Sequence, residues 1–595
     1  MAALAVVLGF TRNCDTVQLA ATLRQAQRMR GPDEESAWSA PGITLSVCHL
    51  FRSASHRCND HRTDQSMLDC IIAWDGRLDN RDELLGALGL PLTQAVSDAA
   101  LLAHGWRRWG RALPERLLGD YAFALWDRRD RTLFCARDPV GARPFYYTWQ
   151  RDFLAIASDD EALIRLPGVS ADWHPDRLFY RDNPGFWAFD WQNTWRKDVL
   201  ILMPGGSLCC DAEGRLLRRR WHRWGPAPEC FRGTGEEEAD AFGEVFRRAV
   251  RDRLRDVETI GVIASGGIDS LGVLTAAHLE RAGRTIRQFS VVHDEGLAEI
   301  ETRSIMLAAE RLGLERHWFH VPSMRGAAGR EDLERVHAHV HPVDDTIPII
   351  ALMSLIARRE GSPFLLHGAS GDCVLWASDH YIADRLLTGG LRALPECWHE
   401  ASRAAKHHTY LSGAAIPRII LRALLWRTVP PWFRHLWRLR HDGPFDEPKQ
   451  LAPGFASGRA QRAACTRRHL RAVLAHERRA WRSPDAEYLD QLQPVGVLRG
   501  LEGYQRVAGR YGVDLADPFA DLRVIHMARA LMNHRTCDGW TKAPLRFWVA
   551  KNLDPSDAVF RSDKTHLGWL CARPGEWEAG GEQMRRSTQP ADPRP

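Results

Sequence analysis

The residues best suited to chemistry lie in one short loop that runs from Ser265 to Ser270 with the sequence S-G-G-I-D-S. A short β-branched run ends at Ala264, just before the loop, and a helical pattern follows it. Gly266 and Gly267 permit a sharp turn that brings backbone N–H groups close to an anion. The start of the helix adds its dipole and N–H donors, and the two serines add hydroxyls. This combination predicts a cradle for phosphate oxygens.

Asp269 in the same loop would be poorly placed against a bare phosphate, because both groups are negative. Its position fits a Mg²⁺ ion that lies between the carboxylate and the phosphates. ATP and Mg²⁺ are therefore the predicted cofactors, and the helix is expected to begin near Asp269 and Ser270. The loop lacks the G-K-[ST] ending of a Walker A loop and the G-x-G-x-x-G of a dinucleotide fold, which excludes those two classes.

The chain has 595 residues, more than one hydrophobic core usually supports, so two or more domains are expected. Residues 1–220 show period-two patterns and turns, including a hairpin around residues 127–130, and predict an antiparallel-rich α+β domain. Residues 236–570 alternate helices with short strands, which predicts a parallel sheet covered on both faces. Residues 575–595 have the composition of a disordered tail.

The overall composition limits the partners and the compartment. A net charge of +5 is too small to indicate a nucleic-acid partner. The 13 cysteines are scattered without C-x-x-C pairs, which argues against a disulfide framework or structural zinc and favours a reducing cytoplasm. No apolar stretch reaches the roughly 18 residues that a membrane span requires. We expect the apolar residues 1–10 to form a first strand and not a signal peptide.

A helical insertion is predicted over residues 380–490. Its segment 416–440 is rich in tryptophan and arginine at helical spacing and is broken by Pro430 and Pro431. Three interpretations of this segment stay open. It forms an arginine-rimmed pair of core helices, a groove for a peptide or partner protein, or a contact with a membrane surface.

Several segments resemble known families. The S-G-G-x-D-S order resembles the loop of ATP pyrophosphatases. From about residue 66 to 569 the chain resembles class B asparagine synthetases, in segments such as WDGRLDNRDEL, HGASGDCVLW and KAPLRFWVAKNLDPSDAVFRSDKTHLGW. The resemblance implies an Ntn-hydrolase-like glutaminase domain over residues 1–220. It also implies, over residues 236–570, an ATP pyrophosphatase domain of the adenine nucleotide alpha hydrolase type, with a parallel sheet and a large helical part.

The resemblance also implies roles for individual residues. Asp372 falls on the family's metal-binding aspartate, so Asp269 and Asp372 are expected to hold Mg²⁺. Lys564 falls on the lysine that contacts the phosphates, where it would neutralise charge that grows on the α-phosphate. Three further residues are expected at the nucleotide site, namely Ala264, Val291 and Gly368.

The first domain departs from the family where glutamine hydrolysis would take place. That chemistry needs an N-terminal cysteine whose own α-amine is the base, but Ala2 stands there and Cys14 is internal. Asp75 replaces the family's glutamine-binding asparagine, whereas Asp98 falls near its substrate aspartate. We therefore expect a degenerate glutaminase domain that serves as a scaffold or docking surface.

The predicted acyl site also departs from the family. His341 precedes a proline where the family has an acidic residue, and it is the candidate for accepting the proton of the attacking amine. Asp344 and Asp345 are alternative candidates, and a packed histidine without a catalytic role is a further interpretation. Arg546 orients a carboxylate, supports the phosphate-binding lysine or forms a structural ion pair. Cys373 stands in place of the family's glutamate as a small filler.

A chain without a working glutaminase must take its amine from solution or from the substrate itself. The second option resembles the lasso peptide cyclases, which have a degenerate glutaminase domain and a long helical insertion. The resulting prediction is a cytoplasmic ATP-dependent ligase that adenylates an Asp or Glu side chain of a ribosomal precursor peptide. The N-terminal amine of that peptide then forms an isopeptide macrolactam, and a leader-peptide protease or recognition protein is the expected partner. The alternatives are an ammonia-dependent asparagine synthetase or small-molecule amide ligase, and a non-catalytic peptide-binding scaffold.

Overall fold

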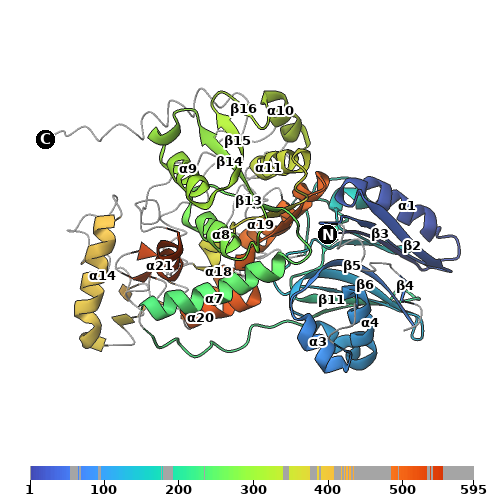
Figure 1. The fold of residues 1–595 in the computed structure, drawn as a ribbon. Helices are drawn as coiled ribbons and strands as arrows, with labels where there is room; N and C mark the ends of the chain where they lie inside the picture. The colour runs from blue at the N-terminus through green and yellow to red at the C-terminus, as the bar shows by residue number, and fades with distance from the viewer. Residues whose placement is uncertain are drawn as a thin grey trace.

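The computed structural model describes two halves that lie side by side, each built on six-stranded sheets (Figure 1). In the part of the chain that it describes, no helix is long and apolar enough to cross a membrane. The described residues are 2–53, 64–65, 69–91, 96–175, 177, 192–233, 235–339, 347–375, 385–386, 390–407, 417, 421, 424–425, 428–430, 433, 484–492, 495–531, 536–537 and 540–553.

The first antiparallel sheet of the N-terminal half has the first strand of the chain near its middle. This strand is buried on both faces, because one face packs on the second sheet and the other on α1. The prediction of a strand within residues 1–10 is therefore confirmed. In spatial order, with its covering helices, this sheet comprises β10 (Leu200–Ile201), β8 (Tyr146–Trp149), β9 (Phe153–Ala157), β1 (Ala2–Gly9), β3 (Ile43–His49), β2 (Glu34–Ala40), α1 (Thr16–Ala26) and α5 (Asp160–Leu163).

The second antiparallel sheet of this half lies face to face with the first, and apolar side chains from both form the core between them. Its own outer face is covered by helices, so the half has helices outside two sheets. The predicted antiparallel-rich α+β domain is therefore confirmed. The expected hairpin is present, with Asp127 opposite Thr132. In spatial order the elements are β12 (Leu216–Arg220), β11 (Gly206–Asp211), β7 (Thr132–Arg137), β6 (Gly119–Asp127), β5 (Cys70–Leu78), β4 (Asp64–Gln65), then the helices α3 (Arg81–Leu88), α4 (Asp98–Trp109) and η3 (Gly110–Arg116).

The C-terminal half contains the predicted parallel sheet, with the short edge strand β16 antiparallel to the rest. Apolar side chains fill both faces of this sheet, which explains the continuous apolar runs of its strands. In spatial order the strands are β16 (Arg325–Gly326), β15 (Glu315–Val321), β14 (Ile286–His293), β13 (Ile260–Ile263), β17 (Phe364–Leu366) and β18 (Asp514–Ala516).

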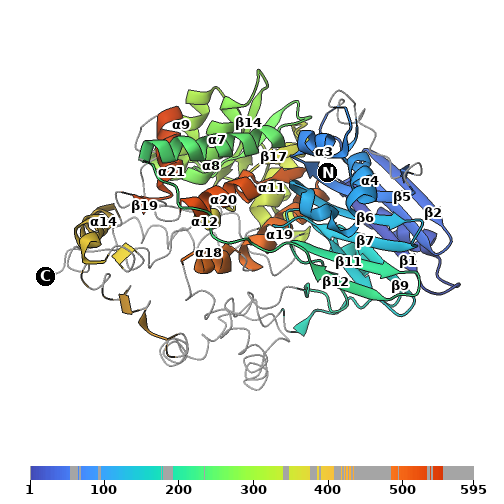
Figure 2. The same cartoon turned by 90° about the horizontal axis from the view of Figure 1, so that it is seen from below.

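Helices cover both faces of the parallel sheet. The helices α7, α20 and α21 lie side by side on one face together with α8 (Figure 2). The helices α10, α11 and α19 pack on the other face. The bounds are α7 (Gly235–Arg253), α8 (Ile268–Leu279), α9 (Ile300–Leu312), α10 (Arg330–His339), α11 (Ile347–Arg359), α19 (Val495–Arg510), α20 (Leu522–Ala530) and α21 (Ala543–Asn552).

Most of the predicted helical insertion lies outside the described residues. Its described parts include three helical segments, η6 (Gly390–Ala393), α14 (Leu394–His407) and α18 (Pro484–Leu492). The segment 416–440 is described at a few positions only, and residues 575–595 are not described. The three interpretations of the tryptophan- and arginine-rich segment therefore stay predictions.

Buried ion pairs join the two halves of the molecule. In two pairs the arginine belongs to the N-terminal half and in two it belongs to the C-terminal half. The side chains of these pairs are almost fully buried. A buried charge is tolerated only with a partner, so these pairs fix how the halves sit on each other. The pairs are Arg143 with Asp514 (2.6 Å), Arg253 with Asp120 (3.1 Å), Arg137 with Glu502 (3.1 Å) and Arg506 with Asp160 (2.7 Å).

Candidate active site

The predicted phosphate loop links the end of β13 to the start of α8. The helix begins at Ile268, with Gly267 at its N-cap, so the expected start near Asp269 and Ser270 was too late by one to two residues. Gly266 has a φ of +77°, and a Cβ atom there would lie 2.5 Å from the carbonyl oxygen of Glu301. Both facts require glycine at this position.

The loop is held by its own serines and by the neighbouring strand. The Ser270 hydroxyl donates to the Gly267 carbonyl at 2.9 Å, and the Ser265 N–H donates to the Ser270 hydroxyl at 3.2 Å. The hydroxyl of Ser290 on β14 donates to the Ala264 carbonyl at 2.7 Å, which fixes the end of the preceding strand. The turn is therefore preorganised, as an anion-binding loop must be.

A second loop follows β17 and lies directly against Asp269. It leads into the short helix α12 (Gly371–Val374), whose first turn contains Asp372. A Cβ atom at Gly371 would lie 2.5 Å from the carboxylate carbon of Asp269, and one at Gly368 would lie 3.1 Å from its backbone. The two glycines are therefore what allows this loop to approach Asp269.

Asp517, just beyond the C-terminal end of β18, holds the second loop in place. Its Oδ2 atom accepts from both the backbone N–H and the hydroxyl of Ser370, each at 2.8 Å. Its Oδ1 atom accepts from the Phe519 N–H at 3.0 Å. Since β13, β17 and β18 are parallel neighbours, their C-terminal ends bring both loops to one edge of the sheet.

Lys542 joins the two acidic residues of the site. Its ammonium nitrogen contacts Oδ2 of Asp269 directly and lies 2.5 Å from Oδ1 of Asp372. The lysine side chain is 9% exposed, whereas that of Asp372 is 61% exposed. Burial alone would lower the pKa of Lys542, but the two carboxylates outweigh it and raise that pKa above its ordinary value. The lysine is therefore charged at neutral pH.

The two carboxylates fit the Mg²⁺ ion that the sequence predicts. Asp269 and Asp372 converge on one point, which the Lys542 ammonium occupies, so Mg²⁺ would bind through their remaining oxygens or displace this ammonium. Mg²⁺ in nucleotide sites is held by one or two carboxylates together with phosphate oxygens, which matches this donor set. Among the described residues no group of three or more His, Cys, Asp or Glu side chains forms a metal site. These two side chains would be the protein's ligands to the ion.

The structure places the predicted site residues in three groups. The loop from Ser265 to Ser270, Gly368 and Asp372 come together as expected. Val291 on β14 is buried in the apolar core with Phe319, so its predicted contact with the nucleotide stays a prediction. The residues that lie outside the described part of the chain are His341, Asp344, Asp345 and Lys564.

Lys542 is the site residue that sequence reasoning missed. It lies within the same C-terminal segment as Lys564, but the resemblance assigned the phosphate contact to Lys564 alone. One local feature marks its position. Lys542 stands directly before α21, and the proline in the first turn of that helix marks where the helix begins. Nothing in the local sequence shows that this lysine reaches an aspartate 273 residues away.

Arg546 and Cys373 lie beside the site. Arg546 is buried, donates to the Thr541 carbonyl at 2.9 Å and stacks on the ring of Trp540 at 5.2 Å, contacts that support the turn before Lys542. Burial and the adjacent Asp372 raise the pKa of the Cys373 thiol to about 11. This thiol is therefore protonated at neutral pH, which agrees with a filler and not a nucleophile.

The N-terminal half has ion pairs where the resemblance implies glutamine chemistry. The Ala2 N–H donates to the fully buried Asp75 at 2.8 Å, and the Arg30 guanidinium lies 3.2 Å from the same carboxylate. Asp98 pairs with Arg81 and, at 3.0 Å, with Arg255 of the other half. The acidic groups of this region are thus occupied by internal arginines.

A parallel sheet with a glycine-turn phosphate loop, an acidic second loop and a buried lysine between them defines an α/β protein with a site suited to hold the phosphates of a nucleotide. The matches to known families agree with this class of site. Residues 241–569 match the family "Asparagine synthase", and residues 1–221 match "Glutamine amidotransferase domain". The chain belongs to the asparagine synthase family, whose members are AMP-forming carbon–nitrogen ligases.

Individual relatives are distant and match in part. A putative asparagine synthetase (glutamine-hydrolyzing) of Mycobacterium bovis is 27% identical over 50% of this chain and 48% of its own length. Asparagine synthetase (glutamine-hydrolyzing) 3 of Bacillus subtilis is 24% identical over 45% of this chain and 44% of its own. The chain thus spans about half the length of these curated relatives. Among solved structures, the glutamine phosphoribosylpyrophosphate amidotransferase of B. subtilis is 13% identical with a TM-score of 0.27, over 62% of this chain and 90% of its own.

Proposed function

We propose that this ligase closes an isopeptide macrolactam in a ribosomally made precursor peptide. An oxygen of an Asp or Glu side chain attacks the α-phosphorus of ATP, and pyrophosphate leaves. The N-terminal amine of the same peptide then attacks the acyl carbon of the adenylate, AMP leaves, and the amine loses one proton. The peptide loses one water in total, and ATP is converted to AMP and pyrophosphate.

The geometry of the two loops supports the first step. The N–H groups at the start of α8 and the hydroxyls of Ser265 and Ser270 form the holder for the leaving pyrophosphate. Asp269 and Asp372 would hold Mg²⁺, which supplies charge neutralisation for the phosphates. Lys542 lies between these carboxylates and is placed to stabilise negative charge on the phosphates as the carboxylate attacks. Lys564 is proposed to stabilise the same negative charge, and this proposal rests on the resemblance alone.

Internal ion pairs fill the region of the N-terminal half where glutamine would bind. This supports a reaction in which the substrate itself supplies the amine. Asp75 and Asp98 are held by Arg30 and Arg255, so the groups that would recognise glutamine are engaged within the protein. A peptide that presents both its amine and its activated carboxyl makes the second step intramolecular, which corresponds to effective concentrations of about 10⁵ M or more. His341, with Asp344 and Asp345 as alternatives, is the proposed acceptor of the amine proton.

A second candidate function is an ammonia-dependent asparagine synthetase, which the names of the relatives favour. One assay separates the two candidates. The protein is incubated with ATP and Mg²⁺ together with either a processed precursor peptide or aspartate and ammonium, and AMP is measured. AMP release that requires the peptide, with loss of one water from the peptide mass, supports the macrolactam synthetase. AMP release with aspartate and ammonium, and none with any precursor peptide, contradicts it. No AMP release with peptide still bound indicates a non-catalytic scaffold.

A further inference from the structure

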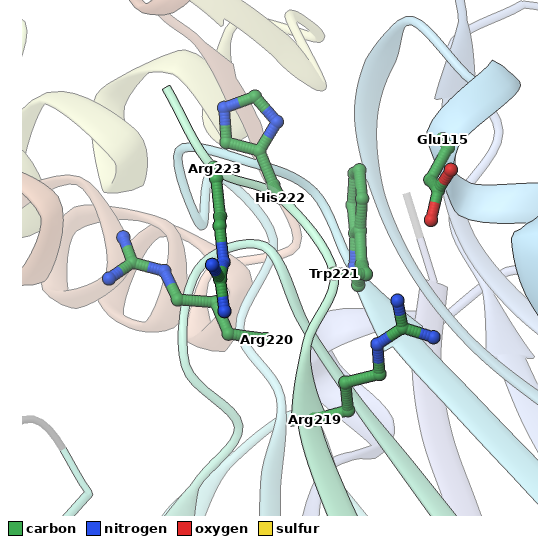
Figure 3. A pocket seen from close by; sticks show the side chains of 6 residues that line it. All are labelled: Glu115, Arg219, Arg220, Trp221, His222 and Arg223. Carbon is green, nitrogen blue, oxygen red and sulfur yellow. The ribbon is translucent and has the colours of Figure 1, made fainter. Parts of the chain in front are cut away.

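The strand β12 and the residues that follow it form a strongly basic edge of the N-terminal half. A cavity of about 520 Å³ lies against this segment, and its walls include one acidic side chain (Figure 3). A smaller cavity of about 130 Å³ is lined by Arg218, Arg219, Arg220 and the neighbouring strands. The residues around the larger cavity are Glu115, Arg219, Arg220, Trp221, His222 and Arg223.

The positive charges of this edge are not balanced within the described part of the chain. No carboxylate there lies within ion-pair distance of Arg218, Arg219, Arg220 or Arg223, although Glu115 faces Arg219 across the cavity (Figure 3). On the same hairpin, Arg215 does pair with carboxylates, at 2.6 and 3.3 Å. An uncompensated group of arginines around a cavity attracts a ligand that carries more than one negative charge.

His222 adds a polar group that lacks a partner. Its buried Nε2 atom has no hydrogen-bond partner among the described residues. Burial, Arg220 and His526 lower the pKa of His222 to about 4, so the ring is neutral at physiological pH. His222 therefore adds no positive charge, and its Nε2 is too buried to contact a ligand, so the charge of this edge comes from the arginines.

The outer side of β12 pairs with no other strand in the described part of the chain. Among the described strands β12 pairs only with β11, so it is an edge strand. Trp221 donates to the Gly205 carbonyl at 2.9 Å, and Asp211 donates to the Arg215 carbonyl at 3.4 Å. Because antiparallel hydrogen bonding alternates along a strand, odd-numbered residues face β11. Arg218 and Arg220 therefore direct their N–H and C=O groups outward.

We propose that an acidic peptide segment in extended conformation binds along the outer edge of β12, with its carboxylates on Arg219 and Arg223. Strand addition supplies the main-chain hydrogen bonds, and the arginines select acidic side chains. That this segment belongs to the precursor peptide, outside the part that forms the ring, rests on the proposed function. The binding itself does not, because it needs neither ATP nor the phosphate loop.

Trp221 argues for a peptide and against a nucleic acid. Its ring packs on the core of the N-terminal half, and its Nε1 donates to the Gly206 carbonyl at 3.1 Å. The Arg218 guanidinium is stacked over Tyr147 at 5.5 Å from the ring centre. Trp221 and Tyr147 are therefore engaged, whereas single-stranded nucleic acids are usually bound on exposed aromatic rings. Trp149, whose ring lies 5.8 Å from the Arg218 guanidinium, is 48% exposed, so competition by an oligonucleotide is part of the test.

Charge recognition is tested by fluorescence polarisation of a labelled ten-residue peptide with alternating Glu and Thr, without ATP. Wild-type protein is expected to bind it, and the double variant Arg219→Glu with Arg223→Glu to bind at least about tenfold more weakly. The control Arg108→Glu reverses one exposed charge on α4 and is expected to bind within about twofold of wild type. Equal binding by the double variant and wild type, or displacement of the peptide by an oligonucleotide of equal charge, overturns the proposal.

The strand edge is tested by comparing Arg218→Pro with Arg218→Ala. Both variants lose the same charge, but only proline removes the outward N–H, and an outward position on an edge strand tolerates proline. Arg218→Pro is expected to bind the peptide at least about fivefold more weakly than Arg218→Ala, with the same melting temperature within about 2 °C. Equal affinity of the two folded variants overturns strand addition.

Binding and catalysis are separated with Asp269→Ala. This variant is expected to bind the acidic peptide as wild type does while it releases no AMP. If wild type binds the peptide and no substrate yields AMP, the proposed function fails and the binding site stands. If AMP release with a precursor is unaffected in the Arg219 and Arg223 double variant at limiting peptide, the site does not serve the substrate.

Discussion

Lys542 and Asp269 are 273 positions apart in the sequence and form a direct ion pair at the end of the phosphate loop. The same ammonium lies 2.5 Å from Asp372, so one lysine connects the two carboxylates that are suited to hold Mg²⁺. This arrangement brings three segments, the ends of β13 and β17 and the start of α21, to a single point. The chemistry of the site depends on that convergence.

Replacing Lys542 with methionine is expected to remove much of the charge stabilisation at the phosphates. The turnover number should fall by about 10²–10³-fold, the range for loss of one preorganised donor in a polar transition state. Pyrophosphate release at saturating ATP and peptide is the measurement. Lys551→Met is the control, because Lys551 on α21, the helix that follows Lys542, is half exposed and pairs with Asp240 at the surface. A Lys542→Met enzyme with the turnover number of the control would contradict the role.

Replacing Gly371 with alanine is expected to push the second loop away from Asp269. The added methyl group would lie 2.5 Å from the Asp269 carboxylate carbon, closer than any real contact, so the loop must move. Activity should fall at least about tenfold, with a higher Mg²⁺ requirement, because a 1 Å displacement disturbs metal and phosphate together. Gly86→Ala is the control, since outside its chain neighbours and its own helix backbone no atom lies within 4 Å of a Cβ there. Full activity of Gly371→Ala at low Mg²⁺ would contradict this geometry.

Asp372→Asn is expected to weaken the Mg²⁺ site without unfolding the protein. The side chain is 61% exposed, so the substitution removes a ligand charge and little packing. The Mg²⁺ concentration for half-maximal AMP formation should rise about tenfold or more, and chelation should abolish activity of both proteins. An unchanged Mg²⁺ dependence in Asp372→Asn would show that this carboxylate is not a ligand.

Asp514→Asn is expected to destabilise the junction between the halves. Asp514 is fully buried and accepts from Arg143 at 2.6 Å and Arg52 at 2.9 Å. Leaving two buried arginines without their carboxylate costs about 3–5 kcal/mol at pH 7. Denaturant unfolding measures it, with Asp69→Asn as the control, because that carboxylate forms an exposed pair with Arg129 worth about 0–1 kcal/mol. Equal stabilities of the two variants would contradict the structural role.

The same carboxylate predicts a sensitivity to acid. Burial alone would raise the pKa of Asp514, but Arg143 and Arg52 outweigh it and hold the pKa well below its ordinary value. The unfolded chain therefore binds a proton more readily, so the stabilisation is complete above about pH 4 and is lost as the pH falls toward the folded pKa. The free energy of unfolding of wild type should fall more steeply below about pH 4 than that of Asp514→Asn. Parallel curves for the two proteins would contradict this.

The sequence predicts the parts of the site that depend on neighbouring residues. The loop from Ser265 to Ser270 is recognisable because the left-handed turn at Gly266 and the helix start are local properties. The strands and helices of both halves follow from periodicity for the same reason. Asp372 needed the resemblance to a family, since an isolated aspartate after two glycines has no distinctive local signal.

Contacts between distant segments are what the sequence does not contain. The buried position of Lys542 depends on how α21 packs against α7 and α8, and its pairing with Asp269 follows from that packing. The approach of Gly371 to Asp269 and the pairing of Arg143 with Asp514 are likewise properties of the assembled fold. The resemblance therefore predicted Lys564 as the phosphate-binding lysine and not Lys542, although both lie in the same C-terminal segment.

The most direct test of the central claim follows an isotope from the peptide into AMP. A precursor peptide whose acceptor carboxylate is enriched in heavy oxygen is incubated with the protein, ATP and Mg²⁺, and AMP is analysed by mass spectrometry. Adenylation of the carboxylate predicts AMP that gains one heavy oxygen for each macrolactam formed, and Asp269→Ala should form neither product. Macrolactam formed together with unlabelled AMP, or with ADP, would contradict the account.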